Sequence, residues 1–340
     1  MPVPMAAAGR VERRCAVGGD LTELRRDLVE ELRRSLGFDY FAFLLTDPQS
    51  EVGSAPIAEV PSVPDLPRLI RLKYLTPVNR WTALTTPVAL LRSGGDLARS
   101  LVWREWMAAY GIADVASVVF RDRYGCWGFL DLWRSGERPE FTAADAALLT
   151  AVAGLITTAL RSGQAETFRA RPPSAERSAP VVLMLSPQLD LLGQTPQTPD
   201  FLRTLVPPPL GRAPIPAGAY NVAAQLLAVE AGVDTHPAYA RVHLAAGEWL
   251  TLRADRLGEN IAVTMERTGP AERLDLFGLA FGLSTREAEL LRQLAAGADT
   301  REAARALFVS EHTVQDHLKS IFAKTGLRTR PSLLSHAVGS

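Results

Sequence analysis

The sequence is poor in cysteine, with only Cys15 and Cys126 among 340 residues. The two cysteines form no C-x-x-C pair and no spacing typical of metal ligands, which excludes a disulfide framework and a cysteine-based zinc site. We therefore expect a reducing, intracellular compartment and neither a metal nor another cofactor. Cys126 is either a redox-sensitive thiol or an inert buried one, and its apolar hairpin strand favours the inert thiol.

An excess of charge of one sign is also absent, because 37 lysines and arginines balance 37 aspartates and glutamates. Any surface that attracts nucleic acid must therefore be local. The longest uncharged apolar run, residues 146–160, is shorter than the about 20 residues that a membrane span needs. Since the N-terminus has no apolar signal core, the sequence predicts a cytoplasmic protein that does not enter a membrane. Lysine occurs only at Lys73, Lys319 and Lys324, a bias that is typical of bacteria with GC-rich genomes.

A length of 340 residues predicts two or three domains, and a hydrophobic content of 47% is typical of globular proteins. Residues 1–19 lack a hydrophobic period, so we expect a disordered tail there. Residues 20–162 then alternate helical and strand patterns, which predicts an α+β domain with an antiparallel sheet. The expected elements of this domain are a helix at 21–36, strands at 40–45, 116–121 and 127–133, and a helix at 142–160.

Proline marks the middle of the chain, where twelve of the 24 prolines lie between residues 172 and 237. Residues 163–180 have the composition of a linker, and the proline-rich residues 207–216 are expected to form a loop. Residues 181–270 predict a second, smaller α+β domain. Its expected elements are a strand at 181–185, a helix at 221–230, and strands at 239–244, 248–254 and 261–266.

Residues 271–340 predict an all-α domain of four helices, each with its own start signal. A capping box opens the first helix at Ser284, Asp299 opens the second, and Ser310 opens the third after a connection of about three residues. A short fourth helix is expected around residues 331–338. The third helix has one apolar stripe, and its opposite face carries hydrogen-bonding side chains, as base reading in a major groove requires. The stripe consists of Val314, Leu318, Ile321 and Phe322, and the opposite face includes His312, Asp316 and Lys319.

Residues 283–338 resemble the C-terminal DNA-binding domain of LuxR-type transcriptional regulators. The chain departs from the family pattern at Thr325, where an aliphatic residue is usual, and at Thr300-Arg-Glu-Ala-Ala, where Asn-Lys-Glu-Ile-Ala is commoner. Neither departure removes a start signal. The matching motifs are Leu283-Ser-Thr-Arg-Glu287, Leu291-x-x-Leu-Ala-x-Gly297, Val309-Ser310-x-x-Thr313-Val314, His317-Leu318 and Ile321-x-x-Lys324-x-Gly326-Leu327-x-x-Arg330.

The resemblance implies that the third helix enters the major groove of double-stranded DNA. Gln315, Asp316 and Lys319 would then face bases. Residues 283–340 hold eight Lys and Arg against six Asp and Glu, so one copy should bind DNA weakly. We therefore expect a homodimer on an inverted-repeat operator, with RNA polymerase as a further partner. The alternative is a helical bundle whose polar face is merely solvated. The implied phosphate contacts are Thr300, Arg301, Thr313 and Lys324.

The two upstream domains resemble a GAF sensor module at residues 20–162 and a PAS-like domain at residues 181–270. The GAF resemblance rests on the flanking helices and on the hairpin followed by Phe141-Thr-x-x-Asp145. The isolated His236 and His243 are better explained as surface or core histidines than as metal or haem ligands. Aromatic side chains gather in the first domain, where they either line an apolar effector pocket or pack the core. The pocket candidates are Trp103, Trp106, Tyr110, Trp127 and Phe129, grouped with Tyr74, Trp81 and Trp133.

These patterns predict a sequence-specific transcriptional regulator that responds to a small molecule through its N-terminal domains. No phosphate-binding loop, G-x-S-x-G or HExxH motif occurs, so we do not expect an enzyme. The alternatives are an enzyme or a ligand-free interaction scaffold with a regulatory DNA-binding tail. The uncharged helix around residues 146–160 either joins two copies of the chain or lies wholly inside one domain.

Overall fold

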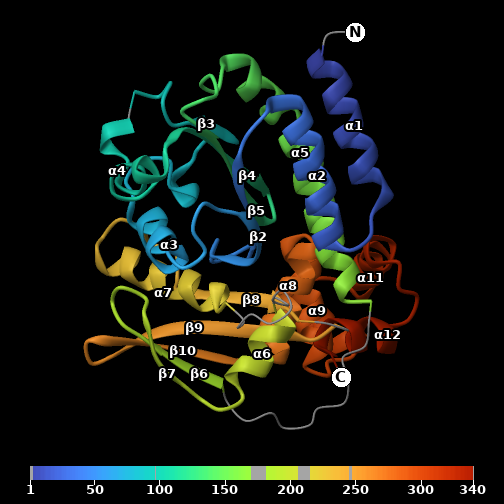
Figure 1. The fold of residues 1–340 in the computed structure, drawn as a ribbon. Coiled ribbons are helices and arrows are strands. Elements are labelled where there is room, and N and C mark those ends of the chain that lie inside the picture. Colours follow the sequence, from blue (N-terminus) through green and yellow to red (C-terminus); the bar gives the residue numbers. More distant parts are fainter. Residues whose placement is uncertain (1–2, 96, 170–180, 206–214, 245–246, 340) are drawn as a thin grey trace. The chain divides into compact units, whose positions relative to one another are not determined.

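The computed structural model describes residues 3–95, 97–169, 181–205, 215–244 and 247–339 (Figure 1). They form two compact units. The first consists of Met1–Leu160, Ala179–Val242 and Thr251–Glu266, and the second of Arg161–Ser178, His243–Leu250 and Arg267–Ser340. The predicted linker at 163–180 and the predicted loop at 207–216 lie largely outside the described residues.

The N-terminal segment is helical, which corrects the prediction of a disordered tail. Helix α1 (Val3–Val17) packs on helix α2 (Leu21–Leu36). Ala7 and Val11 are buried, and Arg10 forms an ion pair of 2.8 Å with Glu31 of α2. Two small apolar side chains and a cross-helix ion pair hold a segment whose own hydrophobic period is too weak to predict a helix.

Helix α2 begins and ends where its sequence predicts. The carboxylate of Asp20 accepts hydrogen bonds from the backbone N–H groups of Thr22 and Glu23, and Gly37 ends the helix with φ of 64°. The leucines at helical spacing form its buried face, as in Leu28 and Leu32. Local capping and periodicity therefore suffice to specify this element.

The first sheet has five antiparallel strands in the order β2-β1-β5-β4-β3. The predicted hairpin is confirmed, with Asp122 opposite Gly125 and Val119 opposite Phe129. Two strands were not predicted, because β2 contains Pro56 and β3 has only three residues. The strands are β1 (Tyr40–Thr46), β2 (Gly53–Glu59), β3 (Val88–Leu90), β4 (Ile112–Asp122) and β5 (Gly125–Ser135).

Helices cover both faces of this sheet. On one face Gly128 of β5 lies so close to helix α5 (Ala143–Thr167) that a Cβ there would approach Leu160 Cδ1 to 3.0 Å and Leu44 O to 2.9 Å. On the other face, α3 (Leu66–Leu75) and α4 (Leu101–Glu105) pack with Trp106 and Trp133 in a hydrophobic core. Short 3-10 turns, η1 (Trp81–Ala83), η2 (Leu97–Arg99) and η3 (Met107–Tyr110), connect them.

Helix α5 is longer than predicted, and one of its faces is exposed. Within the described residues it is long and apolar enough to cross a membrane by length and composition, a test that core helices of soluble proteins also pass. Leu149, Val152 and Ile156 are at most 1% exposed and belong to the core. The opposite face is exposed and consists mainly of small side chains: Ala147, Ala151, Gly154, Leu155 and Thr158.

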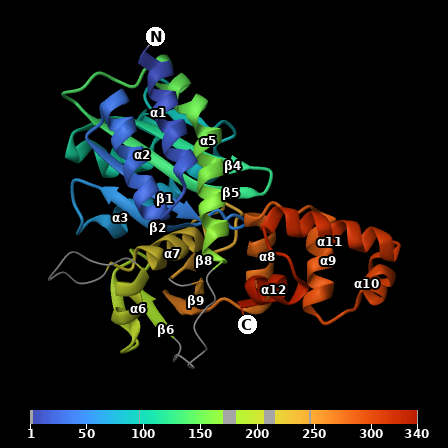
Figure 2. The ribbon, with the colours of Figure 1, turned by 90° about the vertical axis from the view of Figure 1, so that its right-hand side faces the viewer.

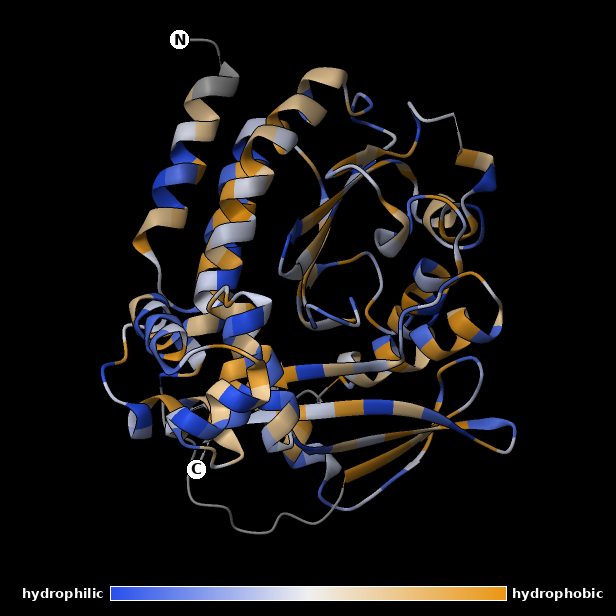
Figure 3. Cartoon of the chain, turned by 180° about the vertical axis from the view of Figure 1, so that it is seen from behind, coloured by the Kyte–Doolittle hydropathy of each residue, from blue (hydrophilic) through white to orange (hydrophobic). Residues whose placement is uncertain are grey.

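The second sheet repeats the strand order of the first. Its order β7-β6-β10-β9-β8 becomes identical to β2-β1-β5-β4-β3 when five is subtracted from each strand number. Strand β9 alternates apolar and polar residues from Leu250 to Asp255, and Figure 3 shows the corresponding bands. The elements are β6 (Val181–Leu185), β7 (Leu191–Gln194), α6 (Thr198–Leu205), α7 (Ala217–Glu230), β8 (Tyr239–His243), β9 (Trp249–Leu257) and β10 (Asn260–Arg267).

Buried charges join the two sheet domains within the first unit. Asp47, after β1, accepts hydrogen bonds from Nε and Nη2 of Arg241 in β8 at 2.6 and 2.9 Å, and both side chains are almost fully buried. Ser50 donates to the backbone oxygen of Tyr239 at 2.5 Å. Helix α7 packs on α3 and β2, as Figures 1 and 2 show.

The second unit contains the C-terminal helices. The four predicted helices are present, and a further helix, α8, precedes them and was not predicted. Phe168, after α5, stacks on Trp249 and meets Phe277 of α8 edge-on, which forms a small aromatic core. A π-helical turn at Ser335–Gly339 ends the described chain. The helices are α8 (Pro270–Ala280), α9 (Thr285–Ala295), α10 (Thr300–Leu307), α11 (Glu311–Thr325) and α12 (Arg330–Leu334).

Candidate functional sites

Short-range caps set the boundaries of the helix-turn-helix. Ser284 with Glu287 and Asp299 with Glu302 both form complete capping boxes, so the predicted start signals are confirmed. The hydroxyl of Ser310 accepts from the backbone N–H of Thr313 at 3.0 Å and opens α11. Because each of these bonds joins residues three apart, the sequence specifies them locally.

The turn between α10 and α11 is tight and contains an unusual residue. Phe308 ends α10 in the left-handed region with φ of 56°, and its ring is 96% exposed. The N–H of the following Val309 donates to Ala304 O at 3.0 Å. This turn places α10 against α11, beside α9 (Figure 2).

The residues predicted to read bases lie together on the exposed face of α11. Gln315, Asp316 and Lys319 are exposed, while Val314, Leu318 and Ile321 are buried beneath them. Lys319 Nζ donates to Asp316 Oδ1 at 3.0 Å, and this hydrogen bond lowers the pKa of Asp316. The exposed face thus offers donors and acceptors within one helical turn.

The residues predicted to contact phosphate fall into two groups. Thr300 and Arg301 lie in the first turn of α10, and Thr313 lies in the first turn of α11, where backbone N–H groups favour anions. Lys324 is different, because its Nζ lies 2.5 Å from the Glu287 carboxylate. Its contact with phosphate stays a prediction that requires this ion pair to open.

Glu287 connects α9 to α11, a role that its capping signature does not reveal. Its carboxylate also accepts from Ser320 Oγ and from the backbone N–H of Ser284, each at 2.6 Å. Burial opposes its ionisation, but hydrogen bonds from Lys324, Ser320 and Ser284 outweigh that effect and lower the pKa of Glu287 to about 2. The reading helix is therefore fixed to its domain by a charged contact between residues 37 positions apart.

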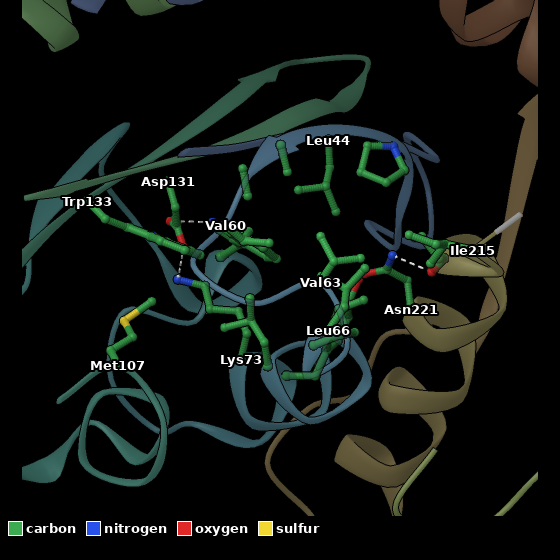
Figure 4. Close-up of a pocket in the computed structure, with 18 residues that line it drawn as sticks. Leu44, Val60, Val63, Leu66, Lys73, Met107, Asp131, Trp133, Ile215 and Asn221 are labelled. Carbon is green, nitrogen blue, oxygen red and sulfur yellow. Dashed lines mark hydrogen bonds and ion pairs between the residues drawn. The ribbon is translucent and has the colours of Figure 1, made fainter. Parts of the chain in front are cut away.

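A cavity of about 180 Å³ lies in the first unit, on the face of the first sheet that α3 covers. Its wall is mostly aliphatic and includes Leu44, Val60 and Leu66, and it is completed by Ile215 and Asn221 at the start of α7 (Figure 4). The cavity is formed by segments that are more than 170 residues apart in the sequence, so no local sequence motif predicts it.

An ion pair lies in the wall of this cavity. Lys73 Nζ of α3 lies 2.8 Å from Asp131 Oδ2 of β5, and both side chains are buried. The indole of Trp81 donates to Asp131 Oδ1 at 2.8 Å, and its ring lies 4.5 Å from Lys73 Nζ. Burial lowers the pKa of Lys73, and the Asp131 charge acts in the opposite direction.

The five aromatic residues predicted to line a pocket do not line this cavity. Trp106, Trp127 and Phe129 are fully buried, which agrees with the alternative of core packing. Trp103 donates from Nε1 to Ile112 O at 2.9 Å, and the Tyr110 hydroxyl donates to Asp65. The aromatic residues that do line the cavity are Tyr74, Trp81 and Trp133.

The remaining sulfur and imidazole groups have structural surroundings. Cys126 is fully buried, and burial raises the pKa of its thiol to about 12, as expected for an inert thiol. His236 Nδ1 lies 2.7 Å from Asp234 Oδ1, and this hydrogen bond raises the pKa of His236. Among the described residues no group of three or more His, Cys, Asp or Glu side chains is arranged to hold a metal.

Comparison with known proteins identifies two modules in the chain. Residues 282–337 match the luxR family of bacterial regulatory proteins, and residues 20–160 match the GAF domain. Over 55 residues the chain is 44% identical to the CsgBAC operon transcriptional regulatory protein of Escherichia coli (strain K12), a match that covers 16% of this chain and 26% of that protein. It is 43% identical over 56 residues to the oxygen regulatory protein NreC of Staphylococcus aureus, with the same coverages.

The chain thus spans about a quarter of the length of these curated relatives. Among solved structures, Escherichia coli SdiA aligns with 94% of this chain and 92% of its own, at 14% identity and a TM-score of 0.34. A TM-score of this size does not establish a shared fold. The family matches are independent of that alignment, and they identify a GAF domain at residues 20–160 and a LuxR-type helix-turn-helix domain at residues 282–337.

Proposed function

We propose that the chain is a cytoplasmic, sequence-specific transcriptional regulator that binds double-stranded DNA and responds to a small molecule. The observation that carries this proposal is the exposed, hydrogen-bonding face of α11 inside a domain that matches the luxR family. The matched modules are regulatory and sensory rather than catalytic, which favours a regulator over an enzyme or a scaffold.

Helix α11 is the proposed reading helix. Gln315 and Lys319 carry donors for purine edges, and Asp316 accepts from a cytosine amino group or excludes other bases. Thr300, Arg301 and Thr313 hold phosphates at the helix N-termini. For Lys319 to reach a base, its hydrogen bond to Asp316 must be exchanged for one to DNA, so the pair selects sequence by the cost of that exchange.

A homodimer on an inverted-repeat operator is the proposed binding state. The small net charge of the helix-turn-helix domain provides little nonspecific affinity for one copy, so two reading helices must act together. The exposed small-residue face of α5 supports an interface there, because close helix packing requires small side chains. Leu155, which is 37% exposed, lies on this face. Contact of the dimer with RNA polymerase would follow at the promoter.

The middle domain is proposed to be PAS-like. Its support is the strand order of the second sheet, which repeats that of the matched GAF domain. A second sensory module of this kind would lie between the GAF domain and the output helices in the sequence.

The test of DNA reading begins with selection of bound sequences from random duplex DNA by the full chain. With the selected operator, Lys319→Ala and Gln315→Ala should each lose about 1–3 kcal/mol of specific affinity and relax preference at one base position. Arg301→Ala should weaken all sequences alike and lower the salt slope by about 1. The matched control is Arg203→Ala, since Arg203 forms the same kind of exposed i,i+3 pair, with Asp200 of α6. Operator binding unchanged in Lys319→Ala would contradict the assignment of α11.

The dimer has a separate test. Leu155→Arg should produce folded monomers with at least about tenfold weaker operator binding, because both half-sites are then bound independently. Leu257→Arg, at an exposed leucine in β9, is the control. A Leu155→Arg chain that keeps the mass of a dimer would exclude the α5 interface.

A further inference from the structure

The cavity beside α3 has the size of a small ring. It measures about 180 Å³, and an engineered apolar cavity of about 150 Å³ takes up benzene. Leu44, Val60, Leu66 and Trp133 provide an apolar wall from the sheet, the following loop and α3. A molecule of one ring with one or two substituents therefore fits, and a long acyl chain does not.

The two charged side chains in the wall neutralise each other, and their hydrogen bonds are made within the protein. Lys73 Nζ donates to Asp131, to Asn79 O at 2.8 Å and to Ser117 Oγ at 3.3 Å, which accounts for its three protons. Asp131 accepts from Lys73 and from Trp81. A charged ligand would lose its hydration without gaining an unpaired counter-charge, so the cavity favours an uncharged one.

Among the described residues that line the cavity, Asn221 and Trp133 each carry a buried polar atom without a hydrogen-bond partner, and the one on Asn221 is an acceptor. Asn221 is 1% exposed, and its Nδ2 donates to Ala217 O at 2.8 Å, but its Oδ1 accepts no hydrogen bond. Burying an acceptor without a donor is unfavourable, and a ligand that supplies an N–H or O–H removes that penalty. Figure 4 shows Asn221 on the side of the cavity opposite the Lys73–Asp131 pair.

Gly53 keeps the corner near Asn221 open. A Cβ on Gly53 would lie 3.3 Å from both Asn221 Oδ1 and the Tyr74 hydroxyl, and 2.4 Å from Leu44 Cδ2. The Tyr74 hydroxyl accepts from the Gly53 N–H at 2.9 Å. Asn221 also belongs to α7 of the middle domain, whereas the rest of this corner belongs to the GAF domain, so a ligand bonded here touches both.

We propose that this cavity binds an uncharged molecule of one ring whose single N–H or O–H donor bonds Asn221 Oδ1, and that the occupied site ties α7 to the GAF domain. The proposal rests on the proposed function for its biological meaning, since such a ligand would be the effector of the regulator. Its chemistry rests on the cavity alone.

The experiment uses three probes of similar size on the full chain: p-cresol with a hydroxyl donor, toluene without one, and benzoate with a negative charge. Calorimetry should show p-cresol binding at least about tenfold more tightly than toluene, and benzoate more weakly than both. In Asn221→Leu, which keeps an apolar side chain of similar size, the preference for p-cresol over toluene should fall to less than about threefold. Equal binding of p-cresol and toluene to the native chain, or an unchanged preference in Asn221→Leu, would overturn the proposal.

A second variant covers the case in which Asn221→Leu does not fold. Ala42→Leu extends a side chain into the cavity from β1 and should abolish binding of all probes, whereas Ala147→Leu on exposed α5 should not. Probe binding that survives Ala42→Leu would place the ligand elsewhere and overturn the proposal. Operator binding is measured in parallel. In the native chain, absence of probe binding with operator binding present refutes the ligand site alone, and absence of operator binding with probe binding present refutes the regulator alone.

Discussion

The GAF-containing unit and the helix-turn-helix are stabilised in different ways. In the helix-turn-helix the caps at Ser284, Asp299 and Ser310 each join residues three apart, and one charged contact, Glu287 with Lys324, crosses between helices. In the first unit, buried ion pairs join residues that are 58 to 194 positions apart in the sequence.

These long-range pairs are Lys73–Asp131 and Asp47–Arg241. The difference teaches that the reading surface is a local product of one helix and its caps, whereas the cavity exists only when distant segments are held together by charge. Variants of the long-range pairs should therefore cost the most stability, and variants in the helix-turn-helix should have smaller, separable effects.

The largest effect is expected for Asp47→Ala. The variant leaves the buried guanidinium of Arg241 without its carboxylate, which should lower the free energy of unfolding by about 3–5 kcal/mol. Urea unfolding followed by tryptophan fluorescence is the measurement, because five of the six tryptophans lie in the GAF domain. Asp200→Ala removes an exposed pair and should change stability by less than about 1 kcal/mol. Equal effects of the two variants would contradict a greater contribution of buried long-range pairs to the stability of the first unit.

A smaller effect is expected for Glu287→Gln, which removes the charge that pairs with Lys324. We expect the helix-turn-helix to lose about 1–3 kcal/mol, because the amide keeps part of the hydrogen bonding. The folded-state pKa of Glu287 is lowered to about 2 from an ordinary 4.5, so its contribution is present above pH 4.5 and is lost as the pH falls toward 2. Helical circular dichroism against urea at pH 7 and pH 3 checks this. If Glu287→Gln and the native chain lost the same stability between pH 7 and pH 3, the acid sensitivity would have to come from other carboxylates.

Phe308→Gly should slightly stabilise the helix-turn-helix. Phe308 adopts φ of 56°, which a side chain disfavours, and its exposed ring loses little packing when removed. We expect a gain of up to about 1 kcal/mol in the free energy of unfolding, with operator affinity unchanged. The comparison variant is Phe277→Gly, which removes a buried ring from α8 and should destabilise strongly. A loss of operator affinity in Phe308→Gly would instead give the exposed ring a part in binding.

The smallest effect is expected at His236, on the domain junction of the first unit. Asp234 at 2.7 Å and Glu51 at 3.9 Å face its imidazole, with Arg121 opposing them, and the pKa of His236 is raised above 6.5. Its contribution is therefore full below pH 6.5 and is lost as the pH rises through the raised value. The urea midpoint should fall modestly between pH 6 and pH 8.5, and His236→Gln should remove that component. A urea midpoint that rises between pH 6 and pH 8.5 would contradict a raised pKa of His236.

The sequence by itself determined the helix-turn-helix and most elements of both sheets. Periodic leucines and Asp20 delimit α2, and Ser284, Asp299 and Ser310 delimit the C-terminal helices, because capping and periodicity are local properties. The exposed positions of Gln315, Asp316 and Lys319 follow from the same period. Strand β2, which contains Pro56, and helix α1, with its weak period, could not be predicted, since each is formed by the partner it packs on.

Only the tertiary structure decided where the buried polar groups lie. Lys73, Asp131 and Asn221 carry no motif, and they meet at one cavity because the sheet, α3 and α7 converge there. The aromatic residues of the first domain show the same limit: Trp127 and Phe129 became core while Trp81 and Trp133 became wall. Phe129 even stacks on Trp81, with ring centroids 4.9 Å apart, so neither residue type nor strand periodicity separates the two groups. The composition gives the number of such side chains. Their burial and pairing arise from contacts between distant segments, which no local sequence pattern encodes.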